Sequence, residues 1–153
     1  MTAATTLRLA TGHIGLNVSE LDRSVDFYRR ALGFEQLAAG DADGRRWAFL
    51  GVDGKLVITL WEQSEGAFST ETPGLHHLSF QVDDIERVRA VESVLRELSV
   101  NFVHEGVVAH GEGVASGGIF FTDPDGIRLE VYAPSGAESA PAPSGAAPTC
   151  GFF

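Results

Sequence analysis

One short pattern occurs twice in the chain and constrains the fold more than any other feature of the sequence. Residues 12–18 and 76–82 both alternate apolar and polar side chains, which is typical of a β-strand whose two faces meet different environments. Each stretch runs directly into an acidic helix start. His13 in the first copy matches His77 in the second, 64 residues later. We therefore interpret the chain as a duplicated unit with one histidine at the same place in each half.

The residues after each copy predict the same order of elements. Apolar spacing predicts a helix in each half, and Asp-Gly pairs mark the turns of hairpins. Ser19 and Asp22 form a capping-box pattern at the first helix start. We predict an α+β fold in which two tandem βαβββ modules form a curved mixed sheet around a cleft. The expected helices cover residues 21–32 and 84–98, and the expected strands after them cover 34–38, 46–50, 55–61, 100–104, 119–122 and 127–132.

Composition divides the chain into segments. We expect a lead-in over residues 1–11, a first module over 12–62, a linker over 63–74, a second module over 75–133 and a tail over 134–153. The tail is rich in Ala, Pro, Ser and Gly, which cannot bury a core, so we expect it to be flexible. It ends in Cys-Gly-Phe-Phe, an apolar end that is suited to docking on the folded part of the chain.

Charge and apolar content exclude several classes of partner. The 153 residues carry 21 acidic and 11 basic side chains, a net charge of −10 that repels phosphate backbones, so we expect no nucleic-acid partner. No apolar run approaches the roughly 20 residues that cross a membrane, and the N-terminus does not read as a signal peptide. We therefore expect a cytoplasmic protein without a membrane partner. The single cysteine, Cys150, excludes an intrachain disulfide and a cysteine-rich metal site.

Three side chains that can bind a metal fall on the strand faces opposite the helices. Alternation places His13, His77 and Glu130 on this concave face. Two imidazoles and one carboxylate leave open positions on a divalent ion of iron, manganese, zinc, nickel or cobalt. Taken singly, each is more typical of a half-buried strand histidine or a solvated sheet acid. Three such residues on equivalent strands of a duplicated unit favour a metal site.

The same face carries side chains that can line a cleft for a small-molecule substrate. His110 lies in a glycine-rich loop that can cover this cleft, so it is our candidate proton carrier, with an exposed loop histidine as the alternative. Arg128 can bind a substrate carboxylate or pair with a neighbouring acid, and we expect the pairing. The predicted cleft residues are Trp47, Phe49, Thr59, Trp61, Ser79, Gln81, Arg128 and Tyr132.

Three motifs together resemble the vicinal oxygen chelate superfamily: the strand at His13, its repeat at His77 and the block over residues 120–132. The resemblance covers residues 12–133. This superfamily includes glyoxalase I, extradiol ring-cleaving dioxygenases, fosfomycin-resistance thiol transferases and bleomycin-resistance proteins. The resemblance implies two βαβββ modules that enclose a cleft with one divalent metal. It also implies a homodimer, and in some such dimers each cleft draws ligands from both chains.

Departures from the family patterns narrow the choice of reaction. Thr59 stands where glyoxalase I has a fourth ligand, a glutamate, while Gly15 and Phe120 replace a threonine and a tyrosine of the fosfomycin enzymes. Extradiol dioxygenases match the three-ligand set and have a histidine near His110, although Phe120 again replaces a tyrosine. We therefore expect a metal-dependent enzyme of the glyoxalase/dioxygenase type that chelates two vicinal oxygens of a small aromatic substrate. The alternatives are a fosfomycin-type thiol transferase and a non-catalytic binding protein of the bleomycin-resistance kind.

Overall fold

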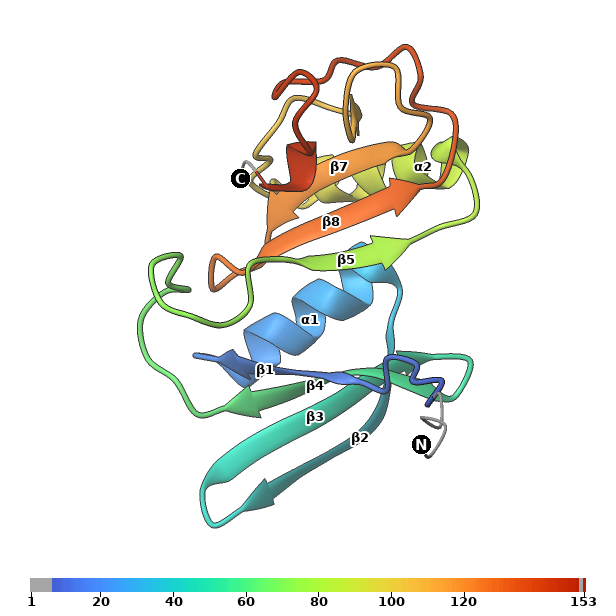
Figure 1. The fold of residues 1–153 in the computed structure, drawn as a ribbon. Coiled ribbons are helices and arrows are strands. Elements are labelled where there is room, and N and C mark those ends of the chain that lie inside the picture. The colour runs from blue at the N-terminus through green and yellow to red at the C-terminus, as the bar shows by residue number, and fades with distance from the viewer. Residues whose placement is uncertain (1–6, 152) are drawn as a thin grey trace, which may run out of the picture.

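Each half of the chain folds into a four-stranded mixed sheet with one helix against it (Figure 1). The computed structural model describes residues 7–151 and 153, so residues 1–6 of the expected lead-in and Phe152 of the expected tail lie outside the description. The elements of the first half are β1 (Ile14–Val18), α1 (Leu21–Leu32), β2 (Glu35–Ala42), β3 (Arg45–Val52) and β4 (Lys55–Glu62). Those of the second half are β5 (Leu78–Gln81), α2 (Ile85–Glu97), β6 (Val108–Ala109), β7 (Gly117–Thr122) and β8 (Arg128–Ala133), followed by the short 3-10 helix η1 (Thr149–Gly151).

The two sheets have the same topology. Their strand orders are β1-β4-β3-β2 and β5-β8-β7-β6, with one parallel pair in each, β1 with β4 and β5 with β8. The predicted α+β fold with a duplicated strand and helix order is confirmed. The strands form two sheets, however, whereas the sequence predicted one curved sheet. Within residues 7–151 and 153, no helix is both long and apolar enough to cross a membrane.

Strand register makes the two sheets comparable position by position. Gly15 pairs with Thr59 in the first sheet, and Ser79 pairs with Glu130 in the second. Thr59 is therefore the structural equivalent of Glu130, as the sequence repeat predicted. One step further along the same face, Trp61 is the equivalent of Tyr132.

The start of α1 differs from the expected capping box. The residue that caps α1 is Glu20, and the Ser19 hydroxyl donates to Asp125 of the other module, so the capping box expected at Ser19 and Asp22 is wrong. Instead, Glu62 at the end of β4 accepts the backbone N–H of Leu21 at 2.6 Å. A carboxylate beside the N-terminus of a helix satisfies a free donor and the helix dipole together.

The strand expected over residues 100–104 is reduced to a single bridge between Phe102 and Phe121. This segment runs beside β7 only briefly, with Val103 donating its N–H to Phe120 and Asn101 accepting from Thr122. The outer strand of the sheet is the two-residue β6, which comes later in the chain.

The tail, which we expected to be flexible, is packed on the second module over its described residues. Backbone N–H groups of Ala109 and Glu112 donate to Pro141 and Gly145, at 2.8 and 3.1 Å. Thr149 is fully buried, and its hydroxyl donates to the Ala109 carbonyl at 2.6 Å. Backbone hydrogen bonds therefore order this segment without a large apolar core, which explains why its composition indicated flexibility.

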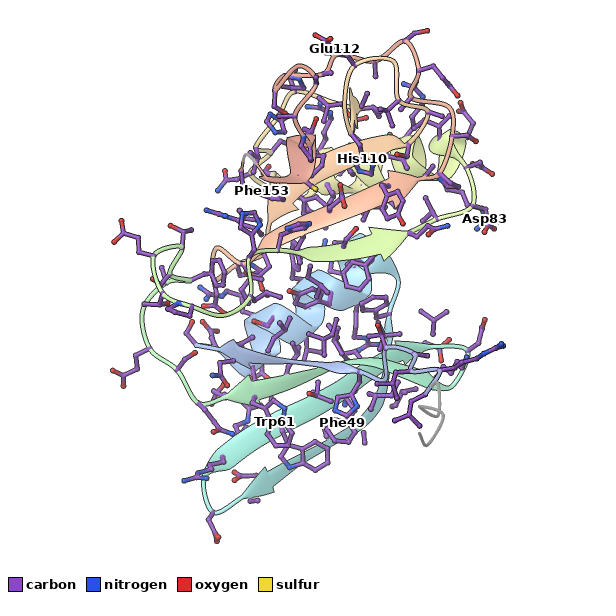
Figure 2. The ribbon with its side chains drawn as sticks, in the orientation of Figure 1. Phe49, Trp61, Asp83, His110, Glu112 and Phe153 are labelled. Atoms are coloured by element: carbon purple, nitrogen blue, oxygen red, sulfur yellow. The ribbon has the colours of Figure 1, made fainter. Side chains whose placement is uncertain are left out.

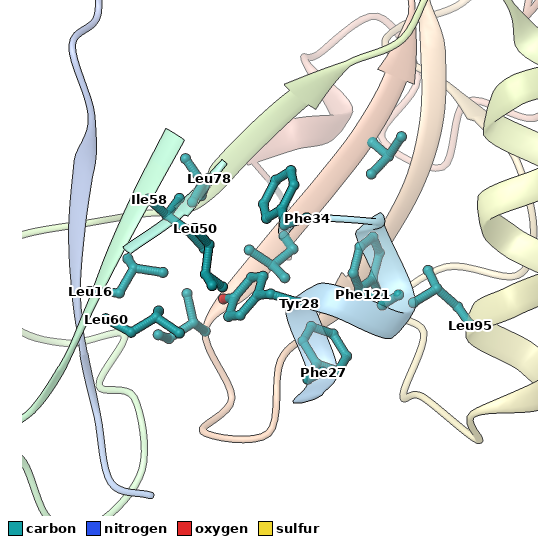
Figure 3. Close-up of a cluster of buried hydrophobic side chains, with 14 of the residues drawn as sticks. Leu16, Phe27, Tyr28, Phe34, Leu50, Ile58, Leu60, Leu78, Leu95 and Phe121 are labelled. Carbon is teal, nitrogen blue, oxygen red and sulfur yellow. The ribbon is translucent and has the colours of Figure 1, made fainter. Parts of the chain in front are cut away.

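The buried side chains of both modules form one cluster around Tyr28 of α1 (Figure 3). Tyr28 has no exposed surface and stacks on Phe34 with ring centroids 6.5 Å apart. Its hydroxyl donates to Asp123 in the β7–β8 turn at 2.8 Å. Burial raises the pKa of Tyr28, and the nearby charge of Asp123 raises it further. The first module is thus joined to the second by a buried polar contact as well as by apolar packing.

We predict that Tyr28→Phe lowers the free energy of unfolding by about 1–3 kcal/mol, because Asp123 loses a buried donor that cannot be replaced by water. Urea denaturation followed by circular dichroism measures the change. Tyr132→Phe is the matched control, because that hydroxyl also donates over 2.8 Å but to the exposed Gln81. An equal loss in both variants would contradict a special role for the Tyr28 contact.

Candidate functional site

The predicted metal ligands separate into two groups, one on each sheet. Glu130 lies on β8 of the second sheet, and His77 immediately precedes the neighbouring β5. His13 is exposed and immediately precedes β1 on the first sheet. Among the side chains that the structure describes, no three His, Cys, Asp or Glu residues are arranged to hold a metal ion. Within the described residues of one chain, the three predicted ligands therefore do not lie together, because His13 precedes a strand of the first sheet while His77 and Glu130 belong to the second half.

Glu130 is the centre of the group on the second sheet. Only 3% of Glu130 is exposed, and both carboxylate oxygens have partners. The Ser79 hydroxyl donates to Oε1 at 2.5 Å, and His110 Nε2 lies 2.7 Å from Oε2. With Glu130 ionised, His110 donates through Nε2, and its Nδ1 accepts from the Ser116 hydroxyl at 2.8 Å. Within the described residues, no lysine or arginine forms an ion pair with this buried acid.

His77 lies beside this group and is half-buried. Burial lowers the pKa of His77, and the charges of His76 and Arg128 lower it as well, against the opposing effect of Glu130. The neutral imidazole is the form that binds a metal. A histidine and a buried carboxylate are the donor types that suit divalent manganese, iron, zinc, nickel or cobalt. The residues on the second sheet therefore fit two of the three positions of the predicted site.

Arg128 differs from the expectation that it pairs with a neighbouring acid. In the described part of the chain it forms no ion pair with a carboxylate, and its Nη1 lies 3.3 Å from Nε2 of His76. Its guanidinium instead lies over the ring of Phe153, 5.5 Å from the ring centroid. The expected pairing is wrong for these residues, and the positive charge of Arg128 faces the site without a carboxylate partner.

The remaining cleft residues of the second sheet lie along the same face. The Tyr132 hydroxyl donates to Gln81 at 2.8 Å. The Tyr132 ring lies 5.1 Å from the ring of His110, whose Nε2 also contacts the buried Glu130, so His110 is only partly exposed. The sequence predicted that the loop of His110 can cover the cleft, but it gave no indication of the contact between His110 and Glu130.

The predicted cleft residues of the first sheet form an aromatic cluster. The ring centroids of Trp47 and Phe49 are 4.8 Å apart, and the Trp61 ring lies 6.2 Å from each of them. Trp61 donates its indole N–H to Thr59 at 2.9 Å, and Thr59 is 1% exposed. Figure 2 shows Phe49 and Trp61 on the first sheet, and His110 and Phe153 beside the second. The first sheet therefore presents aromatic rings that can stack on a ligand, and the second sheet presents ionisable side chains.

Two residues of the site lay outside our prediction. Ser116 holds His110 from the glycine-rich loop, and nothing in the sequence distinguished it from other loop serines. Phe153 stacks on His77 with ring centroids 5.4 Å apart and an angle of 27° between the rings. The apolar end of the tail indicated docking on the folded part of the chain, but the sequence did not indicate the place.

Comparison with known proteins identifies the family. The model of the Glyoxalase/Bleomycin resistance protein/Dioxygenase superfamily matches residues 10–131. The chain is 30% identical over 125 residues to a catechol-2,3-dioxygenase of Bacillus subtilis, covering 80% of this chain but only 40% of that protein. It is 28% identical over 122 residues to a protein named glyoxylase I 4 of Arabidopsis thaliana, covering 78% of this chain and 67% of that protein.

Solved structures show the same fold. A glyoxylase/bleomycin resistance protein/dioxygenase domain from a Frankia species has a TM-score of 0.73 and 27% identity, covering 83% of this chain and 98% of that chain. A fosfomycin resistance protein of Listeria monocytogenes, solved with Mn(II) and sulfate, has a TM-score of 0.63 and 21% identity, covering 86% and 98%. At that identity the second likeness concerns the fold alone.

The pH dependence of stability is expected to depend on His104, which packs edge-on against Phe120 below the site with ring centroids 5.5 Å apart. Its buried Nε2 has no hydrogen-bond partner among the described residues, and burial lowers the pKa of His104 from its ordinary value of 6.5. The unfolded chain therefore binds this proton at higher pH than the folded chain, so His104 costs stability as the pH falls below about 6.5. We predict that His104→Leu reduces the loss of unfolding free energy between about pH 8 and pH 5. Urea titrations at both pH values measure it, and parallel losses in variant and wild type would refute it.

Proposed function

The chain belongs to the Glyoxalase/Bleomycin resistance protein/Dioxygenase superfamily, and we propose that it is a divalent-metal enzyme of the dioxygenase type. Its substrate would be a small aromatic compound that presents two adjacent oxygens. The observation that carries this proposal is Glu130, a buried carboxylate without a described basic ion-pair partner other than His110, one strand away from the half-buried His77. A buried acid of this kind is stabilised by a bound cation.

We assign the metal ligands to two chains. His77 and Glu130 would come from the second sheet of one chain, and His13 from the first sheet of a partner. Each chain carries both ligand groups, the pair His77 and Glu130 and the single His13. A twofold dimer that brings the pair of one chain to the His13 of the other therefore makes two equal and complete sites. The aromatic cluster of Trp47, Phe49 and Trp61 would then face Glu130, so a substrate ring could stack beside the metal.

The metal, when bound, supplies Lewis-acid chemistry and the means to bring O₂ to the substrate. The residues of the chain supply the rest. His110 and Ser79 hold the two oxygens of Glu130 in a fixed orientation. The ionised Glu130 fixes the tautomer of His110, because it can only accept from Nε2, and the Ser116 hydroxyl holds the ring through Nδ1. Nε2 of His110 is thereby placed to carry a proton at the edge of the site. Arg128 would hold an anionic group of the substrate.

Chain mixing tests the assignment of ligands to two chains. We predict that His13→Ala and Glu130→Ala each abolish Mn(II) binding, because each removes a ligand from both sites of the dimer. Coexpression of the two variants regains about a quarter of the wild-type stoichiometry, because half of the dimers are mixed and each mixed dimer holds one intact site. Titration calorimetry on the dialysed proteins measures the stoichiometry, with His104→Ala as the control for loss of an unrelated histidine. No recovery on coexpression, with a dimer present, would show that the ligands do not come from two chains.

An oxygen electrode tests the reaction. With iron loaded under nitrogen, we predict that catechol consumes one O₂ per ring opened and that His110→Gln slows turnover by about 100-fold or more, in line with general acid–base catalysis. Formation of a thiol adduct with fosfomycin would identify a transferase instead. Binding of the aromatic compound that is unchanged by EDTA, without turnover, would identify a binding protein.

A further inference from the structure

The ring of Phe153 lies on the concave face of the second sheet, against the same histidine that we assign to the metal (Figure 2). It stacks on His77 and meets the Phe120 ring edge-on, with centroids 5.1 Å apart and an angle of 72°. The Arg128 guanidinium lies 5.5 Å from the centre of the ring. Two aromatic surfaces and one cation therefore surround an aromatic ring, which is the arrangement of an aryl-binding subsite.

The segment that delivers this ring is anchored. Thr149 is buried and makes two hydrogen bonds to the loop that carries His110, from its hydroxyl to the Ala109 carbonyl and from its N–H to the His110 carbonyl. Cys150 follows in η1 and is half-buried. Burial raises the pKa of the Cys150 thiol, and the charge of Glu130 raises it further.

We propose that Phe153 is an internal ligand of an aryl subsite formed by His77, Phe120 and Arg128, and that an incoming aromatic anion has to displace it. The ring fills the place of an aromatic group, while the Arg128 charge has no described carboxylate partner. A ligand with a ring and a carboxylate offers a group to the aromatic side chains and a group to Arg128, whereas the described contact of Phe153 with Arg128 is made by its ring. This inference rests on the proposed function only in taking this face as the ligand site. It requires neither a bound metal nor turnover.

The tail would therefore compete with ligands for the site. Aromatic pairs contribute enough for about a two- to tenfold change in an equilibrium. Because the ring is tethered, the closed arrangement needs no free ligand, and it raises the apparent Kd of every ligand that needs the subsite by this same factor.

Cys150 is the single cysteine of the chain and provides a direct reporter of tail release. We predict that iodoacetamide modifies Cys150 slowly in the wild type and several-fold faster when benzoate is added. Phe153→Ala is expected to react at the fast rate with or without benzoate. Phe153→Tyr keeps the ring and is expected to behave as the wild type, which controls for substitution at this position.

Benzoate affinity, measured by calorimetry without added metal, completes the test. We predict about two- to tenfold tighter binding to Phe153→Ala than to the wild type. Arg128→Gln should weaken binding in both backgrounds. Equal iodoacetamide rates and equal benzoate affinities in the wild type and Phe153→Ala would overturn the inference. If Mn(II) fails to bind any of these proteins while Phe153→Ala still shows both effects, the internal ligand stands and the metal-dependent function fails.

Discussion

The arrangement of the two modules depends on the contact between α1 and the β7–β8 turn, Asp123-Pro124-Asp125-Gly126. Asp123 closes the turn by accepting the N–H groups of Asp125 and Ile127, and it also accepts the hydroxyl of Tyr28 from α1. Arg23 of the same helix pairs with Asp125 at 3.0 Å. Burial raises the pKa of Asp123, and these donors oppose that effect by stabilising the charged form. Since β8 starts directly after this turn, the helix of one module fixes the strand that carries Glu130 in the other.

Duplication gives the chain two sheet faces with equivalent positions, and different side chains occupy these positions in the two sheets. The residue at the position of Glu130 is Thr59 in the first sheet, and the residue at the position of Tyr132 is Trp61. One face is therefore suited to stacking and the other to charge and proton transfer. In the proposed two-chain site, each face supplies the type of side chain that the other face lacks.

Much of the fold follows from local patterns, and the remainder depends on contacts between distant residues. Alternation and repetition predicted the strand faces and the equivalence of Thr59 and Glu130, because both are properties of short segments. The capping box failed because the Ser19 hydroxyl has a partner 106 residues away in Asp125. The order of the tail could not be predicted for the same reason, since its hydrogen bonds join Pro141 to Ala109 across the sequence. In the candidate site, residue types were predictable, while the contact between His110 and Glu130 was not.

The position of the tail has a consequence for how such proteins diverge. The chain leaves β8, crosses the loop that carries His110 and returns to the concave face, so residues added or lost after β8 are delivered to the site itself. A change in tail length is a simple genetic event that leaves β5, β8 and their side chains intact. In the proposed subsite, substitutions within residues 134–153 would therefore alter which compounds reach the face of the second sheet, while the side chains of β5 and β8 remain unchanged.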